Sequence, residues 1–311
     1  MGAGLRTVYL GNDAWAVPPL EALTDSSHTP VRVVTRVPRP APRGSGTLPT
    51  PVAQAARRLA LPVLEVETVK SGPGFEVLRE ARPDVLVVVA YGEILPPEVL
   101  RLPRLVPVNV HFSLLSELRG PAPVQRAILE GLVSTGVTTM VIDEGIDTGP
   151  VLLQAEEAID PQDEAGSLGA RLAAVGGRLL VDTLDRLEAG TLRPTPQDEA
   201  RASYAPKLGP EDRSIDWEED APAVVRRVRA FAPDPGASTS FRGRPLKVLV
   251  ATDHGGSDEP GTVIRASKDG FLVAAGEGAV APLEVAPAGR KRMTAAEFVR
   301  GYRPVIGERL G

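Results

Sequence analysis

Apolar runs alternate with segments of helical periodicity over the first two hundred residues of the chain. The runs rich in β-branched and apolar residues are the strand candidates: Arg6 to Leu10, Val31 to Thr35, Val85 to Ala90, Val106 to Val110 and Val137 to Ile142. The segments with helical spacing are Pro18 to Leu23, Val52 to Leu59, Gly74 to Glu80, Pro97 to Leu102, Pro123 to Glu130 and Ala165 to Glu188. This order predicts an α/β fold, with a Rossmann-like, mostly parallel sheet and helices on its faces.

The pattern changes near Gly190. Glycine and proline interrupt a polar stretch there, which predicts a linker over residues 190–209. One helix candidate follows, Ala221 to Ala232, and then short strand candidates: Ala237 to Phe241, Leu246 to Ala251, Gly261 to Ala266, Gly270 to Ala274 and Leu283 to Ala286. Their spacing predicts a small, mostly antiparallel barrel or sandwich. We therefore expect two domains, residues 1–189 and 210–311, joined by that linker.

The composition fits a globular protein and narrows its chemistry. A chain of 311 residues can bury two cores, and 42% hydrophobic with 24% charged residues argues against disorder. The absence of cysteine excludes disulfides, thiolate nucleophiles and sulfur-based metal sites. No apolar run reaches the length of a membrane span, and the N-terminal residues enter a strand candidate without a signal segment, so we expect a cytoplasmic protein.

Charge and loop composition limit the possible ligands. The formal net charge of −5 argues against a generic polyanion binder, although it allows local basic patches. The first turn, Gly11-Asn12-Asp13, lacks the further glycines of a dinucleotide fingerprint, so we do not expect NAD or FAD. The stretch Arg36 to Pro51 is rich in proline and predicts a long exposed loop, either functional or a plain surface connection.

The most promising chemistry follows two strand candidates. His28 and His254 lie in turn-like sequence and are expected to be solvated, whereas His111 ends a strand candidate. Asn109 lies two residues earlier and therefore projects to the same face. An amide and an imidazole together could donate hydrogen bonds to an oxyanion that forms on a carbonyl group. The alternative is that both residues only cap the end of a strand.

A carboxylate near His111 would favour the cationic imidazole and could accept a proton from an attacking amine. Asp143 and Asp147 both follow the strand candidate that ends at Ile142. The chemistry of the residues alone does not choose between them.

Several motifs together resemble the methionyl-tRNA formyltransferase family. They are Asn109-Val110-His111-Phe112-Ser113-Leu114-Leu115, Arg119-Gly120-Pro121-Ala122-Pro123-Val124-Gln125-Arg126, Gly145-Ile146-Asp147-Thr148-Gly149, Tyr204-Ala205-Pro206-Lys207 and Pro287-Ala288-Gly289-Arg290-Lys291. The resemblance covers nearly the whole chain. It implies an enzyme that transfers the formyl group of 10-formyltetrahydrofolate to the α-amine of methionyl-initiator tRNA, for translation initiation. It also implies a Rossmann-like catalytic domain followed by an OB-like barrel domain.

The resemblance implies roles for individual residues. Asn109, His111 and Asp147 match the catalytic set, so the resemblance selects Asp147 over Asp143. The following sites are implied as well: Ser113, Leu114, Leu115, Ser116 and Asp143 for the folate, and Arg43, Lys207, Arg290 and Lys291 for the tRNA. We expect no metal ion, and a monomer.

The chain departs from the family pattern at four places. Ser116 stands where the folate loop usually has proline, which predicts a more flexible loop. Asn12 and Asp13 replace the usual Thr-Pro, and bulkier residues than Asp234 and Gly236 are common. The loop after Arg43 lacks its usual lysines, which predicts a shallower salt dependence of tRNA binding.

Two other functions are weighed against this one. The first is a formyltransferase that acts on a nucleotide-linked amino sugar with the same three side chains. The second is a catalytically idle RNA-binding protein, which the intact Asn109, His111 and Asp147 argue against.

Overall fold

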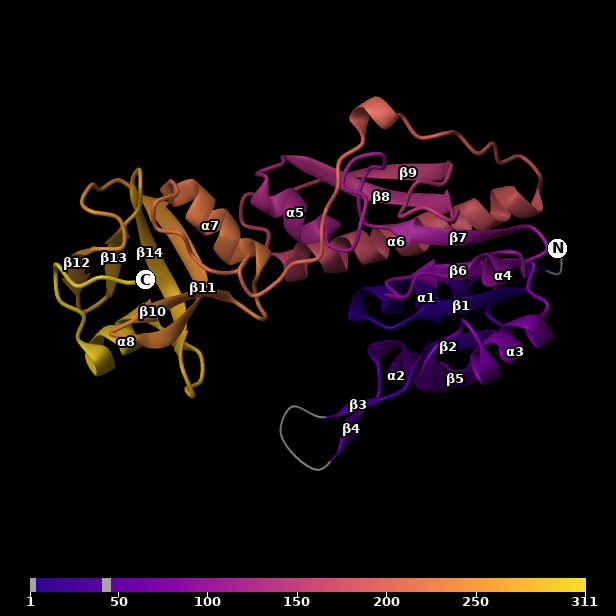
Figure 1. Cartoon of the computed structure of the whole chain (residues 1–311), viewed down its shortest axis with the longest axis horizontal. Helices are drawn as coiled ribbons and strands as arrows, with labels where there is room; N and C mark the ends of the chain where they lie inside the picture. Colours follow the sequence, from indigo (N-terminus) through magenta and orange to yellow (C-terminus); the bar gives the residue numbers. More distant parts are fainter. Residues whose placement is uncertain (1–3, 41–45) are drawn as a thin grey trace. The chain divides into compact units, whose positions relative to one another are not determined.

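The computed structural model describes residues 4–40 and 46–311, which form two compact units (Figure 1). The first unit comprises Met1–Pro123, Ser134–Ala158 and Gly169–Ala205, and the second comprises Val124–Val133, Ile159–Leu168 and Pro206–Gly311. Within the two described ranges, no helix is both long and apolar enough to cross a membrane.

A seven-stranded sheet forms the centre of the first unit, in the order β5-β2-β1-β6-β7-β8-β9. Its strands are β1 Thr7–Gly11, β2 Arg32–Arg36, β5 Val63–Val66, β6 Val85–Val89, β7 Val106–His111, β8 Ser134–Val141 and β9 Val151–Ala158. The first five in this order run parallel, while β8 and β9 pair antiparallel. Every residue of β1 and β6 is buried, as expected for strands covered on both faces. The prediction of a mostly parallel sheet with helices on its faces is confirmed.

The helices of the first unit follow its strands (Figure 1). They are η1 Ala14–Ala16, α1 Val17–Thr24, α2 Pro51–Arg58, α3 Gly72–Ala81, α4 Pro97–Leu100, η2 Glu199–Arg201 and the part of α6 Ala165–Glu188 from Gly169 onward. The sequence defines the start of α2, because the Thr50 side chain accepts the Ala53 N–H and proline occupies the first turn. The stretch expected to be irregular, Arg36 to Pro51, contains a short antiparallel pair, β3 Arg39–Pro40 with β4 Thr47–Leu48.

Glycines allow α6 to approach the sheet closely. A Cβ atom on Gly176 would lie 3.0 Å from Val110 in β7 and 3.4 Å from Val137 in β8, so this part of α6 packs on both strands. A Cβ atom on Gly169 would lie 2.2 Å from the ring of Trp15. That indole in turn meets the ring of Phe112 edge-on, with 6.1 Å between their centroids.

An antiparallel sheet forms the centre of the second unit, in the order β10-β11-β14-β13-β12 with β15 beside β14. Its elements are α5 Pro123–Leu129, α7 Ala221–Ala230, β10 Ala237–Phe241, β11 Arg244–His254, β12 Val263–Ser267, β13 Gly270–Ala274, β14 Ala279–Pro287, β15 Met293–Thr294 and α8 Ala295–Tyr302. The end of the chain joins the two edge strands, because Leu310 bridges to Phe241 in β10 and Arg309 to Thr262 beside β12. The predicted antiparallel β domain is confirmed.

Two histidines were expected to be solvated, and for His28 that prediction is wrong. His28 is fully buried: Nδ1 accepts the Leu5 N–H at 3.0 Å, and Nε2 lies 3.0 Å from Oδ1 of Asp185. Both ring nitrogens find partners, one just before β1 and the other in α6. His254 ends β11 and is exposed, as predicted.

Candidate active site

The structure brings Asn109, His111 and Asp147 together at the carboxyl end of β7, an inner strand of the first unit's sheet. Asn109 and His111 lie at the end of β7, and Asp147 lies in the loop that connects β8 with β9. Nδ2 of Asn109 is 3.4 Å from Oδ1 of Asp147, and Nδ1 of His111 is 3.6 Å from Oδ2 of the same carboxylate. Asp143, the other candidate, makes neither contact.

The environment of His111 determines where its protons lie. The side chain is only 6% exposed, and its Nε2 is 2.9 Å from the carbonyl oxygen of Leu118. A carbonyl oxygen can only accept, so Nε2 carries a proton. Nδ1 then faces the Asp147 carboxylate, where a second proton would turn a contact between two acceptors into a charge-assisted hydrogen bond. The ring is therefore suited to act as an imidazolium.

The backbone around Asp147 is held in an uncommon conformation. Asp147 has φ of +53°, in the left-handed region that aspartate tolerates better than most residues. Its Oδ2 accepts the N–H of Gly120 at 2.8 Å. Gly120 has φ of +110°, and a Cβ atom there would lie 2.7 Å from the ring of Tyr204. A glycine at this position therefore lets a backbone donor reach the carboxylate.

Side chains of β8 and β9 hold the predicted folate loop in place. Thr138 Oγ1 donates to the Ser113 carbonyl at 2.7 Å and accepts the Leu115 N–H at 3.1 Å. Gln154 donates to the Leu115 carbonyl at 2.7 Å. The side chain of Leu114 lies where a Cβ atom on Gly136 would clash, at 2.5 Å. The peptide bond between Leu115 and Ser116 is cis, and Ser116 is buried.

Asp143 lies in the same β8–β9 loop, but its hydrogen bonds stay within that loop. Its Oδ1 accepts the Gly145 N–H at 3.1 Å and the Thr148 hydroxyl at 2.8 Å, while Oδ2 has no hydrogen-bond partner among the described residues. Ile146, between the two aspartates, is 47% exposed. This part of the loop therefore offers a free carboxylate oxygen and an uncovered apolar side chain.

The strand order reverses between β1 and β6, and the side chain of Asn12 spans that point. It donates to the Tyr91 carbonyl after β6, and its oxygen accepts the Thr35 hydroxyl at 2.9 Å and the Arg36 N–H at 2.8 Å. Asn12, at the position where the family pattern has threonine, thus ties together the ends of β1, β2 and β6. Ligands of open α/β sheets bind at such reversals.

The structure describes three of the four residues predicted to bind tRNA. Arg43 is outside the described residues. Lys207, Arg290 and Lys291 belong to the second unit, are exposed, and make no side-chain hydrogen bond or ion pair within the described part of the chain. The last two lie in the turn between β14 and β15.

Two further side chains at this site were given no role from the sequence. Arg119 is 8% exposed and donates from Nε to Oε1 of Gln197 at 3.0 Å. Gln197 donates to the backbone carbonyls of Asp147 and Gly149, both at 2.8 Å. Arg119 stood in a motif that carried the family resemblance, whereas Gln197 lay in a stretch read as a linker and gave no signal.

No group of three or more histidine, aspartate or glutamate side chains within residues 4–40 and 46–311 is arranged to hold a metal ion.

Comparisons with known proteins agree along the whole chain. Residues 5–184 match the formyl transferase family, and residues 207–303 match the formyl transferase C-terminal domain. The chain is 46% identical over 311 residues to the methionyl-tRNA formyltransferase of Roseiflexus castenholzii, with 99% of each chain covered. It is 45% identical over 309 residues to that of Solibacter usitatus, again with 99% of each covered.

Solved structures share the fold at lower identity. The N-formyltransferase of Helicobacter canadensis, in complex with folinic acid and dTDP-3-aminofucose, aligns with a TM-score of 0.67 at 18% identity over 89% of this chain and 98% of that one. HypX of Aquifex aeolicus, in complex with tetrahydrofolic acid, aligns with a TM-score of 0.65 at 19% identity over 98% of this chain and 48% of that one.

Proposed function

The chain belongs to the methionyl-tRNA formyltransferase family, and from that premise we propose how its own residues carry out formyl transfer. The family binds tetrahydrofolate derivatives, and we assign 10-formyltetrahydrofolate as the formyl donor and methionyl-initiator tRNA as the acceptor. The observation that carries the proposal is the meeting of Asn109, His111 and Asp147 at the end of β7 in a chain similar to these enzymes over its full length.

The donor supplies the formyl carbon: a bond forms from the α-amine nitrogen of methionine to that carbon, and the bond from the carbon to N10 of the folate breaks. Negative charge develops on the formyl oxygen as the amine attacks. Asn109 can donate a hydrogen bond to this oxygen, and a cationic His111 can stabilise it through its charge, because both ring nitrogens already face partners, the Leu118 carbonyl and the Asp147 carboxylate. Donors of this kind contribute about 3–4 kcal/mol of barrier lowering.

Asp147 has two tasks in this proposal. Its carboxylate faces Nδ1 of His111 at 3.6 Å and compensates the charge of the imidazolium. It is also the carboxylate nearest to Asn109 and His111, so it takes the proton that the amine loses, directly or through water, and that proton leaves on N10. No covalent link to the enzyme is required.

The proposed folate residues fit a flat heterocycle with hydrogen-bond donors. The free Oδ2 of Asp143 can accept from a ring N–H or amino group, and the exposed Ile146 offers an apolar surface to a ring face. Ser113, Leu114, Leu115 and Ser116 form the other proposed folate segment, which Thr138 and Gln154 hold in place. A site held in this way loses little conformational entropy when the ligand binds.

For the tRNA we propose a grip by Arg43, Lys207, Arg290 and Lys291, of which the last three are exposed and unpaired within the described residues. Unpaired cations can neutralise phosphates without first breaking an ion pair, which suits contacts to the RNA backbone. The division into residues 1–189, a linker at 190–209 and residues 210–311 stays a prediction, as do a cytoplasmic location and a monomeric state.

One assay tests the function and its nearest rival together. Purified full-length protein is given 10-formyltetrahydrofolate with methionyl-initiator tRNA in one reaction and a nucleotide-linked amino sugar in the other. We expect N-formylmethionyl-tRNA in the first reaction and no formylated sugar in the second. Formylation of the sugar alone would reject the tRNA assignment, and no product in either reaction would favour an idle RNA-binding protein.

A further inference from the structure

The segment from Gln197 to Ala205 lies over the loop that follows β7, and we propose that it is a strap that positions Asp147 and His111, with Gln197 as its positioning residue. This inference rests on the proposed function of those two side chains. The segment falls in the stretch that the sequence predicted to be a linker.

Backbone hydrogen bonds fasten the strap to the loop. The Arg119 N–H donates to the Ser203 carbonyl at 2.9 Å, and the Ala205 N–H donates to the Arg119 carbonyl at 2.6 Å. The Ser203 hydroxyl accepts the Leu118 N–H at 2.8 Å, and the backbone N–H of Ser203 donates to the Ser116 carbonyl at 3.3 Å. A connecting linker would not need to pair in this regular way with a loop more than eighty residues away.

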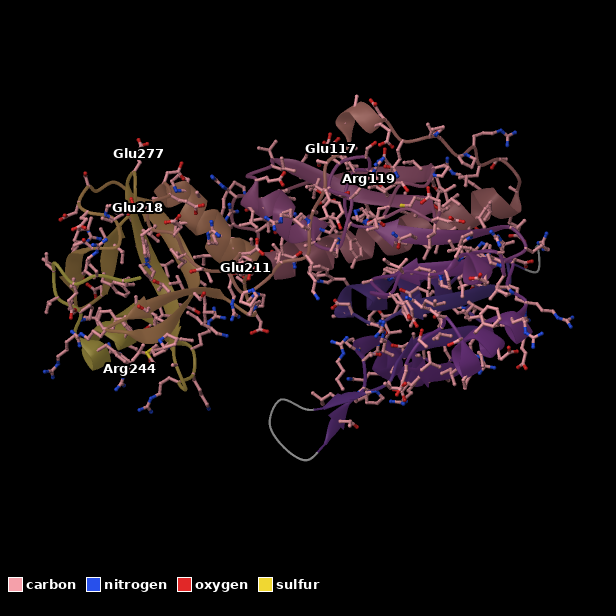
Figure 2. All side chains as sticks on the ribbon, in the orientation of Figure 1. Glu117, Arg119, Glu211, Glu218, Arg244 and Glu277 are labelled. Atoms are coloured by element: carbon pink, nitrogen blue, oxygen red, sulfur yellow. The ribbon has the colours of Figure 1, made fainter. Side chains whose placement is uncertain are left out.

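Two ion pairs add to these bonds. Both guanidinium NH groups of Arg119 reach the Glu199 carboxylate, at 3.1 and 2.7 Å, and Arg201 reaches Glu117 at 2.7 Å. Glu117 and Arg119 are labelled on the loop in Figure 2. The hydrogen bonds that Arg119 donates to the Glu199 carboxylate raise the pKa of Arg119. The paired charges run in opposite directions, from loop to strap and from strap to loop, which fixes the register between them.

The loop under the strap carries the two backbone groups that hold the catalytic side chains. The Leu118 carbonyl accepts from Nε2 of His111, and the Gly120 N–H donates to Oδ2 of Asp147. Between these two residues lies Arg119, which is bonded to the strap through its backbone and its side chain. Displacing the strap would therefore move both partners at once.

Gln197 extends this control to the backbone of Asp147. Its amide nitrogen donates to the carbonyls of Asp147 and Gly149, and its amide oxygen accepts from Arg119. Two of these bonds reach the loop that carries Asp147, and the third reaches Arg119, whose neighbours Leu118 and Gly120 bond His111 and Asp147. A residue in the left-handed region is held there by its surroundings, and here Gln197 bonds the carbonyls on either side of Thr148.

The test compares Gln197→Ala, Gln197→Glu and Gln54→Ala in the full-length protein. Gln197→Glu keeps the shape and can still accept from Arg119, but it has no N–H for the two carbonyls. Gln54 is the matched control, since its amide donates to one backbone carbonyl, that of Pro49, at 3.1 Å on an exposed surface. The measurements are kcat and KM for the folate, thermal unfolding, and hydrogen exchange of the Gly120 amide.

We expect both Gln197 variants to lower kcat by about 10- to 100-fold, because a displacement of about 1 Å in a catalytic group costs roughly that much. KM for the folate should stay within about twofold, the Tm should change little, and the Gly120 amide should exchange faster; Gln54→Ala should match the wild type in kcat and exchange. Wild-type kcat and exchange in both Gln197 variants would overturn the strap. An inactive wild-type protein would instead reject the proposed function, and the exchange of Gly120 would still decide whether Gln197 holds the loop.

Discussion

Replacing Asp147 by asparagine removes one charge and almost no volume, so it isolates the electrostatic part of the proposed mechanism. The carboxylate makes three contacts: Oδ2 accepts the Gly120 N–H at 2.8 Å and faces His111, while Oδ1 faces Nδ2 of Asn109 at 3.4 Å. An amide can keep the bond to Gly120 only by turning its NH2 toward Nδ2 of Asn109. An attraction then becomes a contact between two donors.

The expected loss follows from the proton transfer. General-base catalysis contributes about 10²- to 10⁴-fold, which corresponds to roughly 3–5 kcal/mol at 1.36 kcal/mol for each factor of ten. The loss of the negative charge beside His111 acts in the same direction, since it removes the partner of the imidazolium. We therefore expect Asp147→Asn to lower the rate of formyl transfer by at least about 10³-fold.

Single-turnover formylation of methionyl-initiator tRNA, with saturating enzyme and folate, measures this step directly. Folate affinity and thermal unfolding, measured in parallel, should stay near the wild type. Asp143→Asn is the companion variant, because a single amide oxygen can still accept from Gly145 and Thr148; it should raise KM for the folate and leave the single-turnover rate within about threefold. A single-turnover rate for Asp147→Asn within about fivefold of the wild type would refute the role of the carboxylate.

Three further predictions concern the second unit. Phe298→Ala should lower the free energy of unfolding by about 3–5 kcal/mol in urea, because its buried ring meets three other aromatic rings; a loss below about 1 kcal/mol would contradict this packing. The Gly209 N–H and a neighbouring arginine lower the pKa of Asp212, so this carboxylate stabilises the fold above its unfolded pKa of about 3.9 and loses that contribution as pH falls through the folded value. Asp212→Asn should therefore cost up to about 1 kcal/mol at pH 7 and progressively less as the pH falls below about 3.9, and a cost that does not change with pH would count against the carboxylate. Charge reversal at Arg290 and Lys291 should weaken tRNA binding and reduce its salt slope by about one for each lost phosphate contact, and filter binding that shows the wild-type slope would reject this grip.

The sequence predicts the centre of each sheet better than its edges. The strands β1, β6 and β7 are buried on both faces, and a run of apolar residues is a direct sign of that burial. β5 and β9 are edge strands, and in β9 Leu152 alone is buried while Gln154 and Glu156 are exposed, so no long apolar run marks it. α8 was missed although its capping box, Thr294 with Glu297, is written in the sequence.

The candidate site divides in the same way. The spacing of Asn109 and His111 puts them on one face of a strand, and this is a local property that a sequence can show. The choice between Asp143 and Asp147 depends on the left-handed turn at Asp147 and on a hydrogen bond from Gly120, which are properties of the folded loop. Gln197 is fifty residues from Asp147 along the chain, and no periodicity connects them.

The close contact between Gly169 and Trp15 limits how this sequence can drift. In most exposed helices, replacing glycine with alanine is favourable by about 1 kcal/mol, but here the new methyl group would lie 2.2 Å from the indole. The displaced ring would press on Phe112, the residue next to His111. A smaller side chain at position 15 would have to come first. The two positions should therefore co-vary among related sequences, and a glycine in α6 would be inherited together with the aromatic ring that packs beside the candidate site.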